Sequence, residues 1–491
     1  MTSVAYIWSA ALQRAADELP ANVGRSSLVH GLIRALGLLE NPPDDPDMVK
    51  ERAWDRGGAD GDGRRMNGAE RDGDQGEDNG EDDGEDDDGD NTEEPTHRPI
   101  RGIRVVPPDL SLGTPTELRR YHDPHYLDYV LQPYSGDSSS DSASSGASSS
   151  SSDGSPPPKR RRAAMGLEDD CPRFPALRAY VPLVAAATLT ACRELVRGTH
   201  TAIVWDGGRH HAARARASGF CYVADAVLGI LLLAREGVPR PAGPLEDPPT
   251  ASGHQRLRRP RILYLDMDLH YGDGVAGAFT CPTPFAYPLT TGGRARSPQV
   301  LTLSVHHASR GFFPAGAPGL TARDTPHPFS LSLPLAAFAH APTYARVWAC
   351  VERVRAAWTP DYVVLQLGVD GMPGDRVGQW GAWSPHGVGG STWVAQRVLA
   401  WGVPTAVLGG GGYEHANCAR AWALATAAIV GREMGAETEV PDHENFGAFA
   451  PGFTLEVPES HVPDESSEEA LAEAEETFAV LAERIREIVA L

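Results

Sequence analysis

Five short apolar runs rich in β-branched residues recur along the chain, and each stops at a polar or glycine-rich segment. Helical stretches separate most of them, for example residues 225–235, 343–357 and 391–400. Runs that are apolar on both faces and alternate with helices predict a parallel sheet covered by helices on both sides. Ligands of such folds bind beyond the carboxyl ends of the strands. The runs are TAIVW (201–205), RILYLDM (261–267), VLTLSV (300–305), DYVVLQL (361–367) and PTAVL (404–408).

Two segments are unsuited to packing in that core. Residues 41–100 hold 22 acidic and 7 basic residues, and such a block repels itself and cannot offset the entropy of ordering. Residues 135–165 are rich in serine and contain PPPKRRR, which is typical of a nuclear import signal and equally of a solvated charge run. We therefore predict one α/β domain with two disordered inserts. The domain comprises residues 1–40, 101–134 and 166–491, and the inserts are 41–100 and 135–165.

Both ends of the chain are predicted to be helical. Residues 1–40 indicate two short helices, the second beginning near Ser27. Ser466 and Glu469 have the spacing of a capping box, and the apolar residues that follow favour an amphipathic helix. A closing helix packed on the core is a better interpretation of this segment than a partner-binding helix.

The formal net charge of −22 is unevenly distributed. Residues 41–100 carry −15 and residues 437–491 carry −13, whereas residues 101–436 carry +6. The scattered cysteines, with no Cys-x-x-Cys pair, indicate reduced thiols in a nucleocytoplasmic protein. The longest apolar run, 226–234, is too short to span a bilayer. We expect an intracellular protein that binds no membrane and no specific nucleic-acid sequence.

Carboxylates and a histidine follow two of the runs. Asp266, Asp268 and His270 alternate at one strand end, so their side chains point to one side. Asp370 follows another run. Two aspartates and one histidine, with one position left for water, suit a catalytic zinc or related ion. Either segment alone is better explained by capping and hydrogen bonding, so the prediction depends on their coming together.

Two adjacent histidines follow the run at 201–205. His210 and His211 come after a glycine turn and can both enter a cavity wall. Each would need a carboxylate on its far ring nitrogen to fix its tautomer and basicity. Asp266 and Asp273 are candidates for these partners. Surface histidines without a role are the alternative.

A glycine run and a tyrosine follow the run at 404–408. Glycines 409–412 allow the backbone to approach a ligand closely, and Tyr413 can place a hydroxyl at a developing oxyanion. Phe220 and Phe313 can wall a narrow channel, although core packing is the ordinary role of any one aromatic residue. The whole set indicates metal-assisted hydrolysis of an amide at the end of a slot.

Long stretches of the chain resemble the class I zinc-dependent histone deacetylases, with the pattern of the histone deacetylase 8-like (fungal-type) members. The resemblance spans the chain apart from the two inserts and shorter ones near 240–259 and 281–298. It implies a single arginase/deacetylase-like α/β domain with a central, mostly parallel sheet, helices on both faces and the site at the C-terminal strand ends. The stretches are GGRHHAARARASGFCYVADAVLGIL, RILYLDMDLHYGDGVAGAF, LTLSVHHASRGFFPAG, VVLQLGVDGMPGDRVG and LGGGGYEHANCARAW.

The resemblance also implies an activity, namely hydrolysis of Nε-acetyl-lysine to lysine and acetate by a metal-activated water. Acetylated histone tails or other acetyl-lysine proteins would be the substrates, and chromatin complexes would be partners. The protein would act in the nucleus, with the cytoplasm as a second compartment. The implied catalytic groups are the zinc ligands Asp268, His270 and Asp370, the histidines His210 and His211 with their carboxylates Asp266 and Asp273, and Tyr413.

The family pattern further implies how substrate and product are held. Asp170 would grip the substrate backbone, and Arg25 would belong to an internal path for acetate release. The acyl-lysine channel would be formed by Gly219, Phe220, Phe313 and Val377. A structural potassium ion would bind Asp266, Asp268, His270, Ser304 and Val305.

Several alternatives stay open on the sequence. We choose His211 as the general base and His210 as the stabiliser of charge, but the sequence does not decide between them or between zinc and iron. Acetylated polyamines or longer acyl chains are alternative substrates. A catalytically silent chromatin scaffold is the alternative outside enzymes, and the presence of every ligand argues against it.

Overall fold

In the part of the chain that the structure describes, eight parallel strands form the sheet that the apolar runs predict. Their order is β2-β1-β3-β10-β9-β6-β7-β8, and every neighbouring pair is parallel. The predicted α/β fold class is confirmed. The strands are β1 (Val4–Ile7), β2 (Arg104–Val106), β3 (Thr201–Val204), β6 (Ile262–Asp266), β7 (Val300–His307), β8 (Ser330–Leu335), β9 (Tyr362–Gln366) and β10 (Thr405–Leu408). A separate antiparallel pair joins β4 (Val238–Pro239) and β5 (Leu257–Arg258).

The computed structural model describes residues 3–39, 103–134, 163–236, 238–239, 257–280, 299–319 and 329–490. All of these described residues belong to one unit. The predicted acidic insert and nearly all of the predicted serine-rich insert lie outside the described residues.

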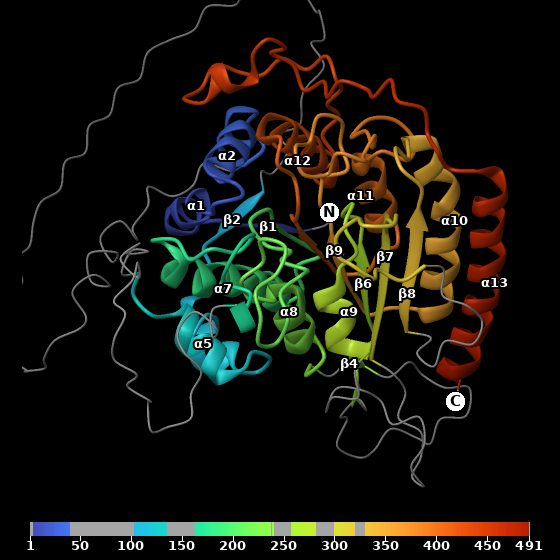
Figure 1. The fold of residues 1–491 in the computed structure, drawn as a ribbon, viewed down its shortest axis with the longest axis horizontal. Coiled ribbons are helices and arrows are strands. Elements are labelled where there is room, and N and C mark those ends of the chain that lie inside the picture. Colours follow the sequence, from blue (N-terminus) through green and yellow to red (C-terminus); the bar gives the residue numbers. More distant parts are fainter. Residues whose placement is uncertain are drawn as a thin grey trace, which may run out of the picture. The chain divides into compact units, whose positions relative to one another are not determined.

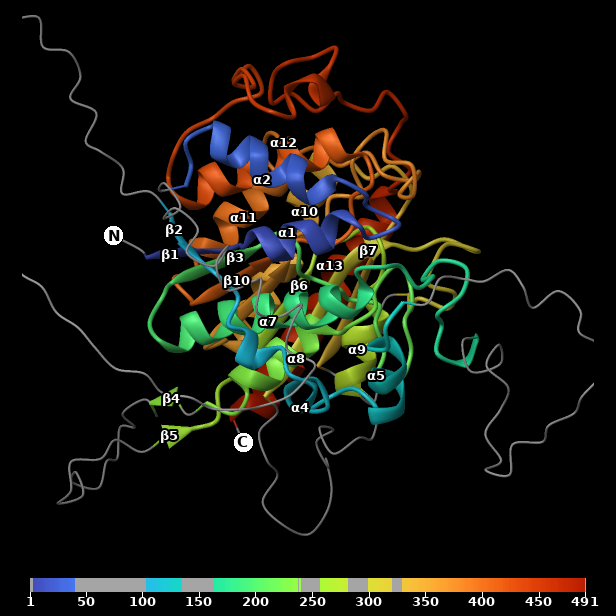
Figure 2. The ribbon, with the colours of Figure 1, turned by 90° about the vertical axis from the view of Figure 1, so that its left-hand side faces the viewer.

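Helices cover both faces of the sheet (Figure 2). The alternation within β9 shows why, because Val363 and Leu365 join one buried cluster and Val364 joins the other. The first cluster includes residues of α2, α10, α11, α12 and α13, and the second includes residues of α1, α5, α7, α8 and α9. The helices are α1 (Ala10–Asp17), α2 (Arg25–Ala35), α4 (Pro115–Leu118), α5 (Pro124–Val130), α7 (Leu177–Val196), α8 (Asp225–Leu233), α9 (Asp273–Thr280), α10 (Ala341–Trp358), α11 (Ser391–Leu399), α12 (His415–Ile429) and α13 (Glu468–Ala490).

The structure adds elements that the sequence pattern did not indicate. Strand β1 precedes the two N-terminal helices, and the second of these begins at Arg25 rather than near Ser27. Strand β8 (SLSLPL) alternates serine with leucine and ends beside a proline, so it lacks the continuous apolar run. At the other end, Ser467 accepts the N–H of Ala470, so the cap of α13 lies one residue after the predicted Ser466.

Helix α13 closes the domain, as predicted. Phe478, Leu481 and Ile485 are fully buried in the core. Arg346 of α10 pairs with both Glu468 and Glu475 of α13. Figure 1 shows α13 lying along the outer side of α10 at one edge of the sheet.

Helix α7 is the one described helix that is long and apolar enough to cross a membrane by composition. Within its most apolar 18-residue window, 72% of the residues are buried inside the protein. It packs against α8, α1 and β3. Its apolar composition is therefore explained by its place in the core.

The strand order brings four carboxyl ends together. Strands β3, β10, β9 and β6 are direct neighbours in the sheet. Parallel strands all end at the same edge, so the segments after these four strands meet there. These are the segments to which the sequence assigned the histidine pair, the tyrosine and the carboxylates.

Candidate metal centre and active site

Three potential metal ligands converge at this edge. Asp268 and His270 follow β6, and Asp370 follows its neighbour β9. One ligand atom from each lies within 4.8 Å of the others, and all three residues are buried. His270 Nδ1 is 2.7 Å from Asp370 Oδ2 and 3.4 Å from Asp268 Oδ1. The structure thus supplies the proximity on which the sequence prediction depended.

Hydrogen bonds orient the two carboxylates. Asp268 Oδ2 accepts the side-chain amide of Gln366 at 2.9 Å and the backbone N–H of Gly411 at 2.8 Å. Asp370 Oδ1 accepts the N–H of Leu269 at 3.0 Å. One face of each carboxylate is therefore held by the protein. This fixes the direction in which the remaining oxygen lone pairs point.

Burial and mutual proximity strongly shift the pKa values in this cluster. Burial raises the pKa of Asp370, and the charge of Asp268 raises it further. Burial opposes the charged form of His270, but Asp370 and Asp268 outweigh this and raise its pKa to about 10. Within the described ranges, neither carboxylate pairs with a lysine or arginine. One imidazole and two carboxylates fit a divalent ion with room for further ligands.

Gly411 leaves the space that the two carboxylates occupy. A Cβ there would overlap the Asp370 carboxylate and lie 2.8 Å from Asp268 Oδ2. We therefore expect Gly411→Ala to lower metal affinity by about 10-fold or more, as displaced ligand supports do. Titration of the metal-free protein with Zn²⁺ measures this. Gly447→Ala, where a Cβ meets nothing within 4 Å, is the matched control, and equal affinities in both variants would contradict the argument.

The two histidines after β3 lie one against the other beside this cluster. Their ring centroids are 3.9 Å apart. His210 Nδ1 lies 2.9 Å from Asp266 Oδ2, and its Nε2 lies 3.7 Å from Asp268 Oδ1. His211 Nδ1 lies 2.8 Å from Asp273 Oδ1. Each imidazole therefore has a carboxylate on its Nδ1, in the pairing that the sequence suggested, and keeps Nε2 for the site.

The pKa values of the two histidines shift in opposite directions. Burial opposes protonation of His210, but Asp268 and Asp266 outweigh it and raise its pKa to about 9. Burial and the charge of His210 lower the pKa of His211 to about 4, although the bond from Asp273 opposes this. The lowered pKa favours the neutral form of His211. A proton acceptor at neutral pH must be neutral, so this shift favours His211 for that role.

Asp225, at the start of α8, positions the histidine pair, and the sequence reasoning missed it. Its carboxylate accepts the backbone N–H groups of Gly208 and Arg209, at 2.8 and 2.7 Å. Thr188 of α7 donates to the same carboxylate at 2.5 Å. Asp225 is completely buried. An aspartate at the start of a helix is usually explained as a helix cap, so the sequence does not indicate this role. Only the folded structure shows that Asp225 accepts the N–H groups of Gly208 and Arg209.

Tyr413 follows the glycine run after β10, on the same side as the metal cluster. Burial, together with the charges of Asp370 and Asp268, raises the pKa of Tyr413 well above its ordinary value, so its hydroxyl stays protonated. Its ring packs against Phe220 at 5.4 Å. Arg25 donates to the backbone carbonyls of Gly410 and Gly412, at 3.0 and 2.9 Å. Arg25, which the resemblance assigns to a product-release path, supports the turn that carries Tyr413.

Aromatic residues stand over the site. The Phe313 ring lies 4.8 Å from the His211 ring and is 38% exposed, so it borders both the site and the surface. Phe312, the neighbour of Phe313, stacks on His270 with the ring centroids 4.8 Å apart. Gly219 is tightly enclosed, because a Cβ there would lie 2.5 Å from His211 and 2.9 Å from Phe313.

The remaining predicted residues surround the site at greater distance. Asp170 Oδ2 accepts the N–H of Gly219 at 2.8 Å, so this carboxylate braces the loop that carries Phe220. Val377 is half-buried in a turn that follows Asp370. Ser304 of β7 lies opposite Asp266 in register, and Val305 follows it in the buried strand.

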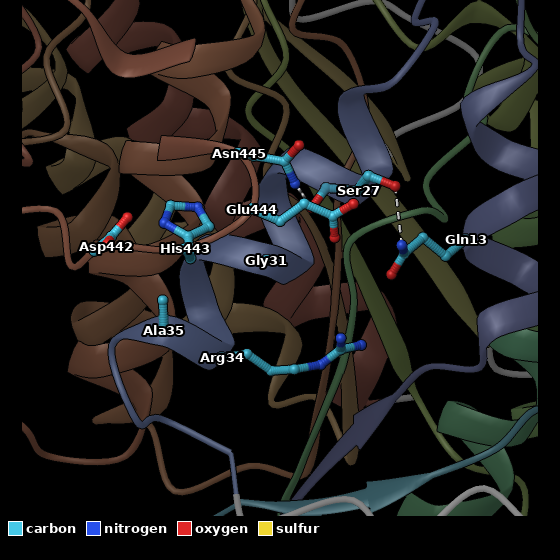
Figure 3. A pocket seen from close by; sticks show the side chains of 9 residues that line it. All are labelled: Gln13, Ser27, Gly31, Arg34, Ala35, Asp442, His443, Glu444 and Asn445. Carbon is cyan, nitrogen blue, oxygen red and sulfur yellow. Dashed lines mark hydrogen bonds between the residues drawn. The ribbon is translucent and has the colours of Figure 1, made fainter. Parts of the chain in front are cut away.

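A pocket of about 380 Å³ lies elsewhere, between α1, α2 and the segment 442–445 (Figure 3). It is lined by polar side chains, and a Gln13–Ser27 hydrogen bond spans part of its wall. None of the predicted site residues lines it. The chemistry therefore belongs to the strand ends and not to this pocket.

Comparison with known proteins identifies relatives of this chain. The family model described as "Histone deacetylase domain" matches residues 104–242 and 250–429. Histone deacetylase 8 of Xenopus laevis is 37% identical over 311 residues, which is 63% of this chain and 82% of that protein. Histone deacetylase 8 of Danio rerio is 35% identical over 312 residues, 63% of this chain and 71% of that protein. Histone deacetylase 6 of Arabidopsis thaliana is 30% identical over 352 residues, which is 71% of this chain and 62% of that protein.

Proposed function

The chain belongs to the histone deacetylase family, as a class I, histone deacetylase 8-like hydrolase, and we propose that it hydrolyses Nε-acetyl-lysine in proteins by a zinc-dependent mechanism. The observation that carries this proposal is the meeting of the Asp268–His270–Asp370 cluster with two carboxylate-bound histidines and Tyr413. Acetylated histone tails are the substrates that the family membership suggests.

Asp268, His270 and Asp370 would hold the zinc ion. Bound there, zinc would polarise the acyl carbonyl and lower the pKa of a water molecule towards neutrality. The chain's own task is to hold the ligands, and the Gln366 and Gly411 bonds to Asp268 serve it. We also propose a structural potassium site near Asp266 and Ser304, which lie side by side on β6 and β7.

The acyl-lysine side chain would enter between Phe220 and Phe313. These rings flank the histidine pair and Tyr413, so the apolar lysine stem packs between them while the amide reaches the polar end. The carbonyl of Gly219 would accept the amide N–H. Asp170, at the rim of the same loop, would hold the substrate backbone.

His211 would accept the proton of the attacking water at Nε2 and later deliver it to the lysine nitrogen. Its low pKa keeps it neutral at pH 7, and the Asp273 carboxylate holds Nδ1–H and stabilises the imidazolium that forms. His210, with its raised pKa, would remain charged and stabilise negative charge. Tyr413 would donate its O–H to the tetrahedral oxyanion.

The decisive experiment measures turnover of acetyl-lysine peptides by the purified, Zn²⁺-loaded full chain, with and without a hydroxamate inhibitor. We expect hydroxamate-sensitive release of acetate. Turnover of acetylated polyamines alone would replace the proposed substrate class. A metal-loaded protein that turns over neither substrate would identify a scaffold.

Asp273→Asn tests the proton acceptor. The Asp273 bond raises the basicity of His211, so its loss makes the imidazole a weaker base. We expect kcat to fall about 10²-fold, the lower end of the range for general acid–base catalysis. The acid-side pKa of kcat/KM should move to lower pH, and a move to higher pH would contradict the assignment. Asparagine also caps helices, so α9 should still begin at this residue.

We further propose that the protein acts in the nucleus, with the cytoplasm as a second compartment, in complexes with chromatin proteins. The basic run at 156–162, which lies outside the described residues, motivates this proposal. Imaging of the full chain with this run replaced by Gly-Ser tests it. Unchanged nuclear accumulation would show that this run is not the nuclear import signal.

A further inference from the structure

Asp375 connects two parts of the site that come from different strands. It lies five residues after the metal ligand Asp370 and is 6% exposed. Its Oδ1 accepts the backbone N–H groups of Val377 and Gly378, both at 2.8 Å. Its Oδ2 accepts the N–H groups of Tyr413 and Glu414, at 2.6 and 3.2 Å. One buried carboxylate thus receives four backbone hydrogen bonds.

These bonds join the Asp370 segment to the Tyr413 turn. On one side, Gly378 lies so close to Asp370 that a Cβ would overlap the Asp370 carbonyl oxygen. On the other, the Asp375 bond is made to the backbone of Tyr413 itself. The distance from the metal cluster to the Tyr413 hydroxyl therefore depends on this carboxylate.

The Tyr413 turn needs such a support because it is glycine-rich. Gly410 and Gly412 have φ of +144° and +138°, and such a segment has little intrinsic preference for one conformation. Arg25 holds its carbonyls from one side, and Asp375 holds its N–H groups from the other. A charged acceptor forms stronger hydrogen bonds than a neutral one.

We propose that Asp375 is a positioning residue that sets the Tyr413 hydroxyl at the place where the oxyanion forms. This inference rests on the proposed function and deepens it. We expect Asp375 to contact neither substrate nor metal and to act only through Tyr413. Its removal should therefore lower kcat while metal affinity and KM stay near their normal values.

Asp375→Asn is expected to remove two of the four backbone hydrogen bonds that this side chain accepts. Asparagine keeps one acceptor oxygen, which readily serves the local turn at Val377 and Gly378. Its NH₂ group cannot accept, so the N–H groups of Tyr413 and Glu414 lose their partner. We expect kcat to fall about 10²-fold, the cost of a misplacement of about 1 Å.

A double-mutant cycle separates positioning from general stability. In a Tyr413→Phe background the same Asp375→Asn change should alter kcat less than about 2-fold, because the group it positions is gone. Equal losses in both backgrounds would overturn the proposal. If wild-type protein shows no deacetylation, the proposed function fails. If Tyr413→Phe loses activity but Asp375→Asn does not, only this inference fails.

Asp464 offers a matched control. It too is a carboxylate that ties two segments, accepting the N–H groups of His340 and Ser466 and the hydroxyl of Thr343. Asp464→Asn should lower the melting temperature without changing kcat. If Asp375→Asn does not fold, Asp375→Ser carries the test, because a serine hydroxyl can still serve the local turn but is too short to reach Tyr413. Full kcat in that variant would refute the proposal.

Discussion

Asp370→Asn is expected to remove both metal and turnover. The substitution keeps the shape of the side chain but removes the charge, and its NH₂ would face the ring nitrogen of His270 that Asp370 now contacts at 2.7 Å. Loss of a Lewis acid forfeits several kcal/mol of transition-state stabilisation, so we expect kcat/KM to fall by about 10³-fold or more. Metal analysis of the purified variant should show substoichiometric zinc.

The control for this variant is Asp442→Asn, which changes an exposed aspartate away from the strand ends. It should bind one equivalent of metal and retain wild-type kcat/KM. Full metal content and full turnover in Asp370→Asn would remove Asp370 from the cluster. Full metal content with lost turnover would show that its role lies in the chemistry rather than in binding.

Tyr413→Phe is the second change with a large expected effect. It removes only the hydroxyl, because the ring contact with Phe220 and the backbone bond to Asp375 are both retained. Loss of one oxyanion donor costs about 10²–10³ in kcat. We therefore expect that loss with unchanged zinc content, measured by steady-state kinetics and metal analysis.

Tyr126→Phe provides the comparison for Tyr413→Phe. The Tyr126 hydroxyl is buried and donates to the carbonyl of Tyr222 at 2.7 Å. Its removal should cost about 1 kcal/mol of stability and leave kcat unchanged. Unchanged turnover in Tyr413→Phe would show that the Tyr413 hydroxyl is not the oxyanion donor.

Much of the fold could be predicted because strong patterns coincide with it. The apolar runs at 261–267 and 361–367 became β6 and β9, since strands buried on both faces must be apolar throughout. Strand β8 was not predicted from the sequence, because its serines interrupt the apolar run. The acidic and serine-rich inserts lie outside the described residues, so the prediction of their disorder stays a prediction.

The sequence predicted the residues that meet in the candidate site, but not all of the residues that support them. Metal ligands and histidine pairs are uncommon combinations at strand ends, so residues such as His270 are recognisable. Asp225 and Asp375 are not, because an aspartate at a helix start or in a glycine-rich turn has an ordinary local explanation. Their functional interest lies in the backbone groups that they accept, and those groups come from segments distant in the sequence.

The sequence by itself determined which side chains stand at the ends of the strands, because the apolar periodicity and the glycine turns are local properties. Only the tertiary structure decided that β3, β10, β9 and β6 are neighbours, which brings Asp268 within reach of Asp370 and His210. It also decided that the pKa of His210 is raised while that of His211 is lowered. The physical reason is that proximity and burial set electrostatic energies, and both arise from contacts between residues far apart in the chain.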